Sequence, residues 1–344
     1  MKLQSLLRAL GAPVQDAEEE TFELFAQDLP SGNLGFIDSK APTLDLTIAG
    51  RDLTVRQSPG VLSSNRAGGT TGAEWLASPT NPFFAHGVLS PSSLALELGC
   101  GISGLVALLL APRISRYVLT DQPYVAKLVE QNVAENQAAS STAAAPTTAA
   151  KAARSSKTRT TTTTPTPNRG SPAAPGRKDA AGSANVSRSS RSGNGGAGGN
   201  IRFTPLDWET DEVTSALTGS AGATSFDVVV ACDCIYNEAL VEPFVSTCVD
   251  LCRLRAAETA AAAAAAGEAG TGEQPSAAAA APCVCVIGQQ LRDPLVFEAW
   301  ATRFTRSFHT WRVPDGLLVA GLRPNQGFVV HVGVLKSDIN LEAI

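Results

Sequence analysis

From residue 93 onward, short apolar segments alternate with helical ones, and this alternation limits the fold more than any other feature of the chain. SLALELGCG, RYVLTD, IRFTPLDW, FDVVVACD and CVCVIGQQ have the apolar character of buried strands, and helical patterns follow most of them. Parallel neighbours need a crossover connection, usually a helix. The alternation therefore predicts the α/β class, with a doubly wound, seven-stranded, mostly parallel sheet. HTWRVP and GFVVHVGVLK, which no helix separates, should add an antiparallel C-terminal edge.

Residues 1–92 are expected to form an N-terminal extension ahead of this domain, which occupies 93–344. The opening 20 residues carry leucines at helical spacing, which predicts one short amphipathic helix. Residues 44–58 alternate apolar and polar side chains around Gly50, which predicts a hairpin. The segment GGTTGAEWLASPTNPFFAHG is rich in turn formers but carries large aromatic residues, including Trp75. We expect it to be a loop that covers a bound cofactor.

Two low-complexity inserts interrupt the domain. Residues 138–200 contain no Leu, Ile, Phe, Trp, Tyr or Met, and 15 of the residues in 256–282 are Ala. Neither insert can bury enough apolar surface to offset the entropy of ordering, so we expect both to be disordered. The Ala run at 260–266 also suits an extended helix. Without the inserts, the chain has the length of one α/β domain.

Charge is unevenly divided along the chain. The whole chain carries a formal charge of −5, but residues 138–200 contain nine Lys or Arg and a single acid. The rest therefore carries −13. An acidic globule with a basic arm suits an enzyme that meets basic partners, such as a basic protein substrate, better than a dedicated duplex-DNA binder.

The seven cysteines are odd in number and lie in apolar runs, which is typical of reduced, buried thiols in an intracellular protein. Their Cys-x-Cys and Cys-x-x-x-Cys spacings differ from the Cys-x-x-Cys knuckles of structural zinc, so no metal is expected. No apolar run is long enough to span a bilayer, and the opening residues resemble neither a signal peptide nor a presequence. These features predict a cytoplasmic protein without membrane contact, with the nucleus as an alternative.

The strongest chemical signal is ELGCGISG, which begins at Glu97. Its G-x-G-x-x-G spacing, with Gly99 and Gly101, lets a tight strand-to-helix turn approach a ligand closely. That spacing suits either a nicotinamide dinucleotide or S-adenosylmethionine. Glu97 favours the second, because a carboxylate repels a pyrophosphate and attracts an ammonium group. Asp121, which ends the next strand, can accept both ribose hydroxyl protons of either cofactor.

Two later segments end strands at the same edge of the predicted sheet. PLDW places Trp208 where its indole can lie against an adenine, although a Trp in this position is more often a core residue. CDCIY places Asp233 and Tyr236, three residues apart, where they can converge on one small polar group. The alternative is a helix N-cap at Asp233 and a packed Tyr236.

These segments together resemble the seven-strand S-adenosylmethionine-dependent methyltransferases, and among them the protein lysine methyltransferases marked by Asp-x-x-Tyr. The resemblance is strongest to the fungal ribosomal lysine N-methyltransferase 5 group. It rests on the GGTTGA…W lead-in, on ELGCGISGLVALLLAPRISRYVLTDQPYV, and on CDCIYNEALVEPFV with the later GQQLRDPLVFEAW. It covers nearly the whole chain outside the two inserts.

The resemblance implies a role for each motif. Asp233 and Tyr236 orient the acceptor amine, and the reaction is transfer of a methyl group from S-adenosyl-L-methionine to a lysine of a ribosomal protein, the stalk protein of the large subunit. It implies no metal and no specific nucleic acid. The cofactor contacts it implies are Trp75, Gly99, Cys100 and Gly101 at the methionine part, Asp121 at the ribose, Trp208 at the adenine and Cys232 on the same wall.

Three alternatives remain open on the sequence. A nicotinamide oxidoreductase shares the glycine spacing, but the chain has no Tyr-x-x-x-Lys pair and no His near a strand end. A methyltransferase-like binding module without catalytic activity would share every motif. A nucleic acid acceptor would call for an N/D-P-P-Y type motif, and ACDCIYNE is not that sequence.

Overall fold

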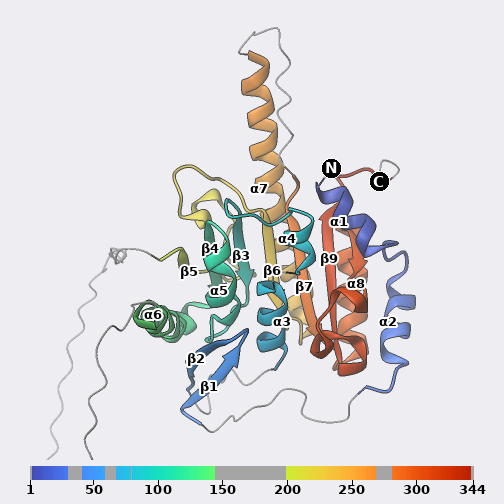
Figure 1. The fold of residues 1–344 in the computed structure, drawn as a ribbon. Coiled ribbons are helices and arrows are strands. Elements are labelled where there is room, and N and C mark those ends of the chain that lie inside the picture. Colours follow the sequence, from blue (N-terminus) through green and yellow to red (C-terminus); the bar gives the residue numbers. More distant parts are fainter. Residues whose placement is uncertain are drawn as a thin grey trace, which may run out of the picture. The chain divides into compact units, whose positions relative to one another are not determined.

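The computed structural model describes residues 2–29, 41–58, 67–78, 80–143, 199–268 and 281–341 (Figure 1). All of them belong to one of the two compact units into which the chain divides, and the other unit, residues 144–198, lies outside the described residues. The helices are α1 (Lys2–Leu10), α2 (Ala17–Phe25), α3 (Ala67–Ala77), α4 (Pro82–Ala85), α5 (Leu105–Leu110), α6 (Ala126–Ala143), α7 (Val241–Glu268) and α8 (Pro294–Ser307). The strands are β1 (Thr43–Ile48), β2 (Arg51–Arg56), β3 (Leu94–Leu98), β4 (Arg116–Asp121), β5 (Ile201–Pro205), β6 (Val228–Cys232), β7 (Val284–Gln290), β8 (Phe308–Arg312) and β9 (Phe328–Leu335).

Seven of these strands form one sheet in the order β5-β4-β3-β6-β7-β9-β8. The pairs from β5 to β7 are parallel, whereas β9 runs antiparallel to both β7 and β8. The predicted fold, a mostly parallel seven-stranded sheet with an antiparallel C-terminal edge, is confirmed. The strand order reverses beside β3, and in sheets of this kind the crevice at such a switch point binds ligands.

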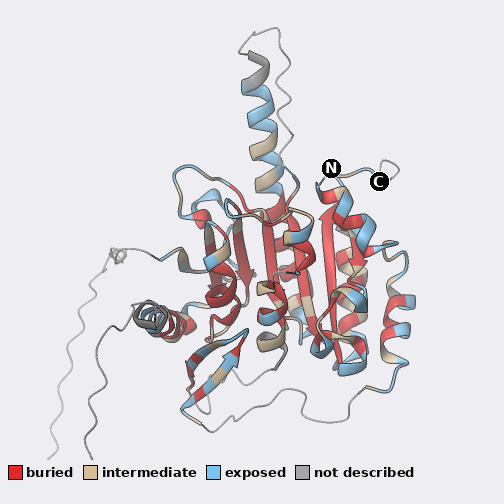
Figure 2. Cartoon of the chain, in the orientation of Figure 1, coloured by how far each residue is buried: buried red, intermediate tan, exposed pale blue. Residues whose placement is uncertain are grey.

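Side chains on the two faces of the sheet build two hydrophobic cores, because successive residues of a strand point to opposite faces. In β6, Val228 and Val230 join a core with α1, α3 and α5. Val229 and Ala231 join a second core with α2, α7 and α8. Apart from the edge strand β5, the strands of this sheet are consequently buried along most of their length (Figure 2). Covering helices on both faces make this a doubly wound sheet.

The predicted hairpin is confirmed as β1 and β2, joined by a two-residue turn at Ala49 and Gly50. Both turn residues have positive φ, 51° and 75°, which matches the twist of a tight hairpin. Two asparagines of α6 bind the free edge of β2: Asn136 accepts from Thr54 N at 2.9 Å, and Asn132 accepts from Arg56 N at 2.8 Å. The hairpin is thus attached to the helix that also supports the glycine loop.

Two N-terminal predictions need correction. The opening 20 residues contain two helices, because Asp16 caps a new helix by accepting from the backbone N–H groups of Glu18 and Glu19. The segment expected as a cofactor-covering loop is mainly helix α3. Burial of Ala73 and Leu76 against α5 and the sheet outweighs the low helix propensity of its glycines.

Helices extend into the beginning of both predicted inserts. Residues 138–143 continue α6, and residues 256–268 continue α7, so the prediction of disorder is wrong there, whereas the expected helical extension through the Ala run at 260–266 is confirmed. Alanine has the highest helix propensity, which lets α7 run into the Ala-rich segment. Of the remaining parts of the predicted inserts, 144–198 and 269–280 lie outside the described residues, and 199–200 and 281–282 are irregular residues ahead of β5 and β7. Across the part that is described, no helix has both the length and the apolarity needed to cross a membrane.

Candidate active site

A crevice of about 720 Å³ opens at the carboxyl ends of β3, β4, β5 and β6. A pocket of this size falls in the usual range for small-molecule and cofactor sites. Its wall brings together all but one of the residues singled out from the sequence: Glu97, Gly99, Cys100, Gly101, Asp121, Trp208, Cys232, Asp233 and Tyr236. The exception is Trp75.

The glycine loop after β3 forms the floor of the crevice. Gly99 has a φ of 63°, and a Cβ there would lie 2.7 Å from Cys234 Sγ and 3.3 Å from the Trp208 ring. A side chain at this position would therefore displace its neighbours. Gly101, with a φ of 61°, faces open space. Its backbone N–H donates to Asp121 Oδ2 at 2.8 Å, which fixes the loop to the end of β4.

Asp121 accepts two backbone hydrogen bonds, from Gly101 and, at 2.7 Å, from Gln122. Burial raises the pKa of this carboxyl group, while the two backbone donors act in the opposite direction. A carboxylate has about four lone-pair positions, so the two bonds leave acceptor capacity for a ligand. Its place at the end of the second strand of the domain is the one that the sequence predicts for a ribose-binding acid.

Glu97 lies beneath the glycine loop and is almost completely buried. It accepts a hydrogen bond from the Tyr117 hydroxyl at 2.9 Å. Burial raises the pKa of Glu97 to about 8, and the nearby Asp121 charge adds to the shift. The side chain is consequently mostly protonated at neutral pH when no cation is bound. A cationic ligand in the crevice would favour its ionised form.

Trp208 forms part of the wall and packs edge-on against Phe244, with 5.3 Å between the ring centroids. Its indole Nε1 is buried and has no hydrogen-bond partner among the described residues. Buried indole N–H groups usually have a partner. Trp208 therefore lines the crevice and also has the packed role considered for it.

Asp233 and Tyr236 follow β6 at the rim. Asp233 adopts a φ of 59°, uncommon for a residue with a side chain, and its backbone N–H donates to Gly288 O at 2.7 Å. Asn237, and not Asp233, caps the next helical turn, and Tyr236 is 61% exposed. The alternative of an N-cap and a packed tyrosine is thus wrong. Both side chains line the crevice.

Two residues at and just after the end of β7 hold the Asp233 side chain in place. Its Oδ2 pairs with Arg292 Nη2, and its Oδ1 accepts a long bond of 3.4 Å from Gln290 N. The side chain of Asp233 is 9% exposed. Sequence reasoning did not assign Arg292 to the site, although it belongs to the GQQLRDP segment that ends β7. Tyr124, on the crevice wall and 67% exposed, was also missed, and its place three residues after Asp121 is the available signal.

The cysteines of the site are not nucleophiles. Cys100, Cys232 and Cys234 line the crevice, and burial raises the pKa of all three thiols. The thiol forms therefore predominate at neutral pH. All seven cysteines are free thiols, as predicted. Within the described ranges no cluster of three or more His, Cys, Asp or Glu has the arrangement of a metal site.

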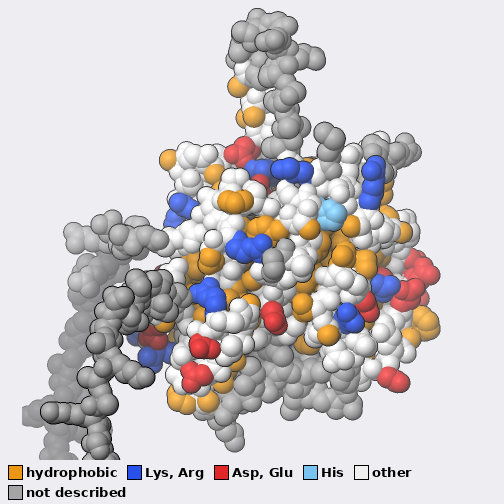
Figure 3. Space-filling model, viewed as in Figure 1, with side chains coloured by type: hydrophobic (Ala, Val, Ile, Leu, Met, Phe, Trp, Pro, Cys, Tyr) orange, Lys and Arg blue, Asp and Glu red, His pale blue; other side chains and the backbone are white. Residues whose placement is uncertain are grey.

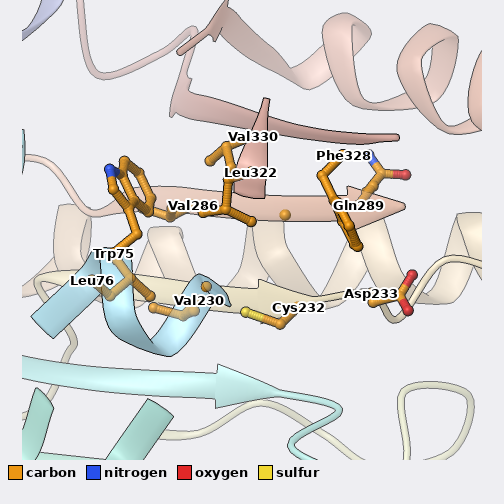
Figure 4. Close-up of a pocket in the computed structure, with 12 residues that line it drawn as sticks. Trp75, Leu76, Val230, Cys232, Asp233, Val286, Gln289, Leu322, Phe328 and Val330 are labelled. Carbon is orange, nitrogen blue, oxygen red and sulfur yellow. The ribbon is translucent and has the colours of Figure 1, made fainter. Parts of the chain in front are cut away.

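Trp75 lies outside the crevice. Its Nε1 donates to Leu317 O at 2.7 Å, and its ring packs against Phe83. It lines a separate, mostly apolar pocket between α3 and the sheet, of about 20 Å³, which is roughly the space of one water molecule. This pocket shares Cys232 and Asp233 with the crevice, but Trp75 and Asp233 lie at opposite ends of it (Figure 4). The structure therefore does not bring Trp75 to the other site residues.

Comparison with known proteins bears on this site directly. A family model described as lysine methyltransferase matches residues 184–264. The matched stretch includes β5 and β6, and hence Trp208, Asp233 and Tyr236. The resemblance to the lysine methyltransferases is confirmed. The seven-stranded sheet agrees with it, because this is the fold that the resemblance predicts.

Two curated relatives match parts of the chain. Ribosomal lysine N-methyltransferase 5 from Zygosaccharomyces rouxii is 25% identical over 223 residues, which are 57% of this chain and 59% of that protein. Diaminohydroxyphosphoribosylamino-pyrimidine deaminase from Schizosaccharomyces pombe is 35% identical over 136 residues, 36% of this chain and 32% of that protein. The chain thus spans about three fifths of the length of the Z. rouxii protein and about a third of the length of the S. pombe protein.

Among solved structures, one match is the N-methyltransferase NodS from Bradyrhizobium japonicum in complex with S-adenosyl-L-homocysteine. It is 12% identical, covers 71% of this chain and 78% of its own, and has a TM-score of 0.35. At this level of likeness, nothing about the chemistry of this chain follows from that structure.

Proposed function

We propose that this chain is an S-adenosyl-L-methionine-dependent protein-lysine N-methyltransferase. The observation that carries the proposal is the crevice at the switch point of the sheet. It joins a glycine loop, the acid Asp121 and Trp208 to the pair Asp233 and Tyr236, in a chain matched by a lysine methyltransferase family model.

The charge of the crevice supports this choice of cofactor. Among the described residues, its wall contains carboxyl groups and no Lys or Arg, and the acids are Glu97, Asp121, Asp207, Glu209 and Asp233. S-adenosylmethionine carries an ammonium and a sulfonium cation and no phosphate, so it suits such a wall. A dinucleotide pyrophosphate would meet repulsion from the acids of this wall other than Glu97, which is mostly protonated, and Asp233, which pairs with Arg292. The same wall therefore disfavours the nicotinamide oxidoreductase alternative.

Residues on this wall fit the parts of the cofactor. Asp121 has acceptor capacity for ribose hydroxyls, the Trp208 indole offers an aromatic surface, and Glu97 offers a carboxyl group for the ammonium. The bound cofactor would supply an electrophilic methyl group, whose bond to sulfur breaks with its electron pair going to sulfur as the new bond to nitrogen forms. The chain's own residues then have to deliver a neutral amine to that carbon.

Delivery of a neutral amine is the main difficulty of the reaction. A free lysine amine has a pKa of about 10.4, so removing its proton at pH 7 costs about 4.6 kcal/mol. Asp233 and Tyr236 stand at the rim with a carboxylate and a phenol, which can hold an amine by hydrogen bonds in the direction of transfer. Orientation of this kind needs neither a metal nor a covalent intermediate.

Two features support a basic protein as the acceptor. The chain outside the first insert is strongly acidic, and acidic side chains gather over α2, where Glu18, Glu19, Glu20 and Glu23 lie (Figure 3). The curated relative from Z. rouxii is named a ribosomal lysine N-methyltransferase. We therefore propose a ribosomal protein of the large-subunit stalk as the acceptor and the cytoplasm as the compartment, with the nucleus as the alternative.

The deaminase named among the relatives offers no competing function. Zinc-dependent deaminases of nucleobases hold their metal through a His and a Cys-x-x-Cys pair. These 344 residues contain no Cys-x-x-Cys. The residues matched to that protein therefore lack the Cys-x-x-Cys pair of such a metal site.

The direct test is to label a protein extract with the purified chain and S-adenosylmethionine carrying a radioactive methyl group. The extract should come from cells in which the corresponding gene is deleted, so that acceptor lysines are unmodified. We expect one labelled protein, with the methyl group on a lysine by mass spectrometry. Binding of the cofactor without any labelled protein would instead support a binding module without catalytic activity.

A further inference from the structure

Arg292 is a cation set against the reaction centre of an otherwise acidic crevice. It follows β7, and its Nη2 pairs with Asp233 Oδ2. Gln290 holds the guanidinium in place: Gln290 Oε1 accepts from Arg292 Nε at 2.9 Å and from Nη2 at 2.6 Å. The arginine side chain is 35% exposed, whereas that of Asp233 is 9% exposed. The pair is therefore half-shielded from solvent, where charge effects are less screened than on the open surface.

Three other acids of the wall accept hydrogen bonds from uncharged donors and not from a cation. Glu97 accepts from the Tyr117 hydroxyl, Asp121 accepts from backbone N–H groups, and Asp207 accepts from Glu209 N at 2.9 Å. Of the acids on this wall, only Asp233 takes part in an ion pair among the described residues. The one carboxylate that is neutralised by a cation is the one at the proposed acceptor position.

This arrangement matters for the protonation of the acceptor. A carboxylate alone stabilises a lysine ammonium and raises its pKa, which makes the neutral nucleophile scarcer. A guanidinium next to that carboxylate cancels its charge and repels the ammonium, so the amine loses its proton to water more easily. The guanidinium group suits this task because it stays protonated across the working pH range.

We propose that Arg292 is a positioning residue that makes Asp233 accept the substrate lysine as a neutral amine. The inference rests on the proposed function and deepens it. Arg292 acts through Asp233, whose oxygens remain hydrogen-bond acceptors for the amine while their charge is compensated. Asp233 thereby orients the nitrogen without holding it in the unreactive ammonium form.

Other titratable groups face the same space and must stay constant in a test. Glu97 comes from β3, Asp121 and Tyr124 from the end of β4, Asp207 and Glu209 from the segment after β5, and Cys232, Cys234 and Tyr236 from β6 and the residues after it. None of these is altered by a substitution at position 292. A change in pH dependence caused by Arg292 can therefore be read by comparing variants at that position alone.

The test compares the pH dependence of kcat in Arg292→Gln and Arg292→Lys, using the acceptor identified by extract labelling. We expect the rise of kcat to shift upward by about one pH unit in Arg292→Gln, hence a loss of about tenfold at neutral pH. Arg292→Lys keeps the positive charge and should keep the wild-type profile. Arg292→Met, which retains an apolar stem, is a second uncharged variant and should behave as Arg292→Gln does.

Affinity for S-adenosylhomocysteine, measured by calorimetry, serves as the control for folding and for the cofactor crevice, and it should be equal in all variants. Equal pH profiles in the Gln, Met and Lys variants would overturn the role of Arg292, whether kcat is retained or lost. If the wild-type chain labels no lysine at any pH, the proposed function fails, and the role of Arg292 fails with it. A labelled lysine with unshifted profiles overturns only the role of Arg292.

Discussion

At the residue scale, Asp121 joins the glycine loop to the proposed ribose position. Replacing it by Ala removes an acceptor for two hydroxyl groups and the bond that fixes Gly101. We expect cofactor binding to weaken by about 1.5–3 kcal/mol, as for other charge-assisted hydrogen bonds. Calorimetry with S-adenosylhomocysteine measures this. Asp45→Ala, on the hairpin, is a matched control, and an unchanged dissociation constant in Asp121→Ala would remove Asp121 from the site.

Glu97 makes a second residue-scale prediction, which concerns stability. Its pKa is raised in the folded chain to about 8, above its ordinary value of 4.5. The folded state therefore holds a proton that the unfolded state releases, and stability falls as the pH rises from about 4.5 to about 8. Glu97→Gln lacks this contribution.

Urea unfolding at several pH values checks this prediction. The free energy of unfolding of the wild type, relative to that of Glu97→Gln, should decline across this pH interval and level off above it. A difference that stays constant from pH 5 to pH 9 would show that Glu97 titrates normally in the folded chain.

At the element scale, the strands and helices after residue 93 were predicted from the sequence, whereas helix α3 was not. Strands and helices after residue 93 follow from alternation and periodicity, since each pattern matches one buried face. The segment around Trp75 was predicted as a loop because glycine and threonine are weak helix formers. Its burial against α5 depends on contacts between distant segments, which local propensity does not contain.

The candidate site divides in the same way. Residues that end strands, such as Asp121 and Asp233, could be placed because the carboxyl ends of parallel strands share one edge of the sheet. The partner of Asp233 could not be placed, since Arg292 lies 59 residues later in the chain, after the end of β7, and reaches Asp233 only through its side-chain conformation. Trp75 was assigned by resemblance alone, and its indole N–H is instead bonded to Leu317.

The position of Trp75 yields a prediction for α3. Trp75→Phe keeps an aromatic ring but leaves the partly buried carbonyl of Leu317 without this donor. We expect the free energy of unfolding to fall by about 1–3 kcal/mol, with unchanged affinity for S-adenosylhomocysteine. Denaturation and calorimetry on the same preparations measure the two effects. A weaker cofactor affinity with unchanged stability would instead place Trp75 at the cofactor, as the resemblance implies.

At the scale of the whole molecule, the uneven charge predicts how the acceptor is recognised. The chain outside residues 138–200 carries a formal charge of −13, so it should attract a basic acceptor at long range. Dissolved salt screens such long-range attraction. We expect kcat/KM for the acceptor to fall several-fold between low and physiological salt, mainly through the association rate. A kcat/KM independent of ionic strength would show that charge does not guide the encounter.

The central claim is that one crevice divides its work, with the glycine loop and Asp121 holding the cofactor while Asp233 and Tyr236 position the acceptor amine. The most direct measurement compares cofactor affinity and methyl transfer in Asp233→Ala and Tyr236→Phe. Both variants should bind S-adenosylhomocysteine as the wild type does and lose methyl transfer, and their losses should not add in the double variant. Full methylation of the labelled lysine by Asp233→Ala would contradict the claim.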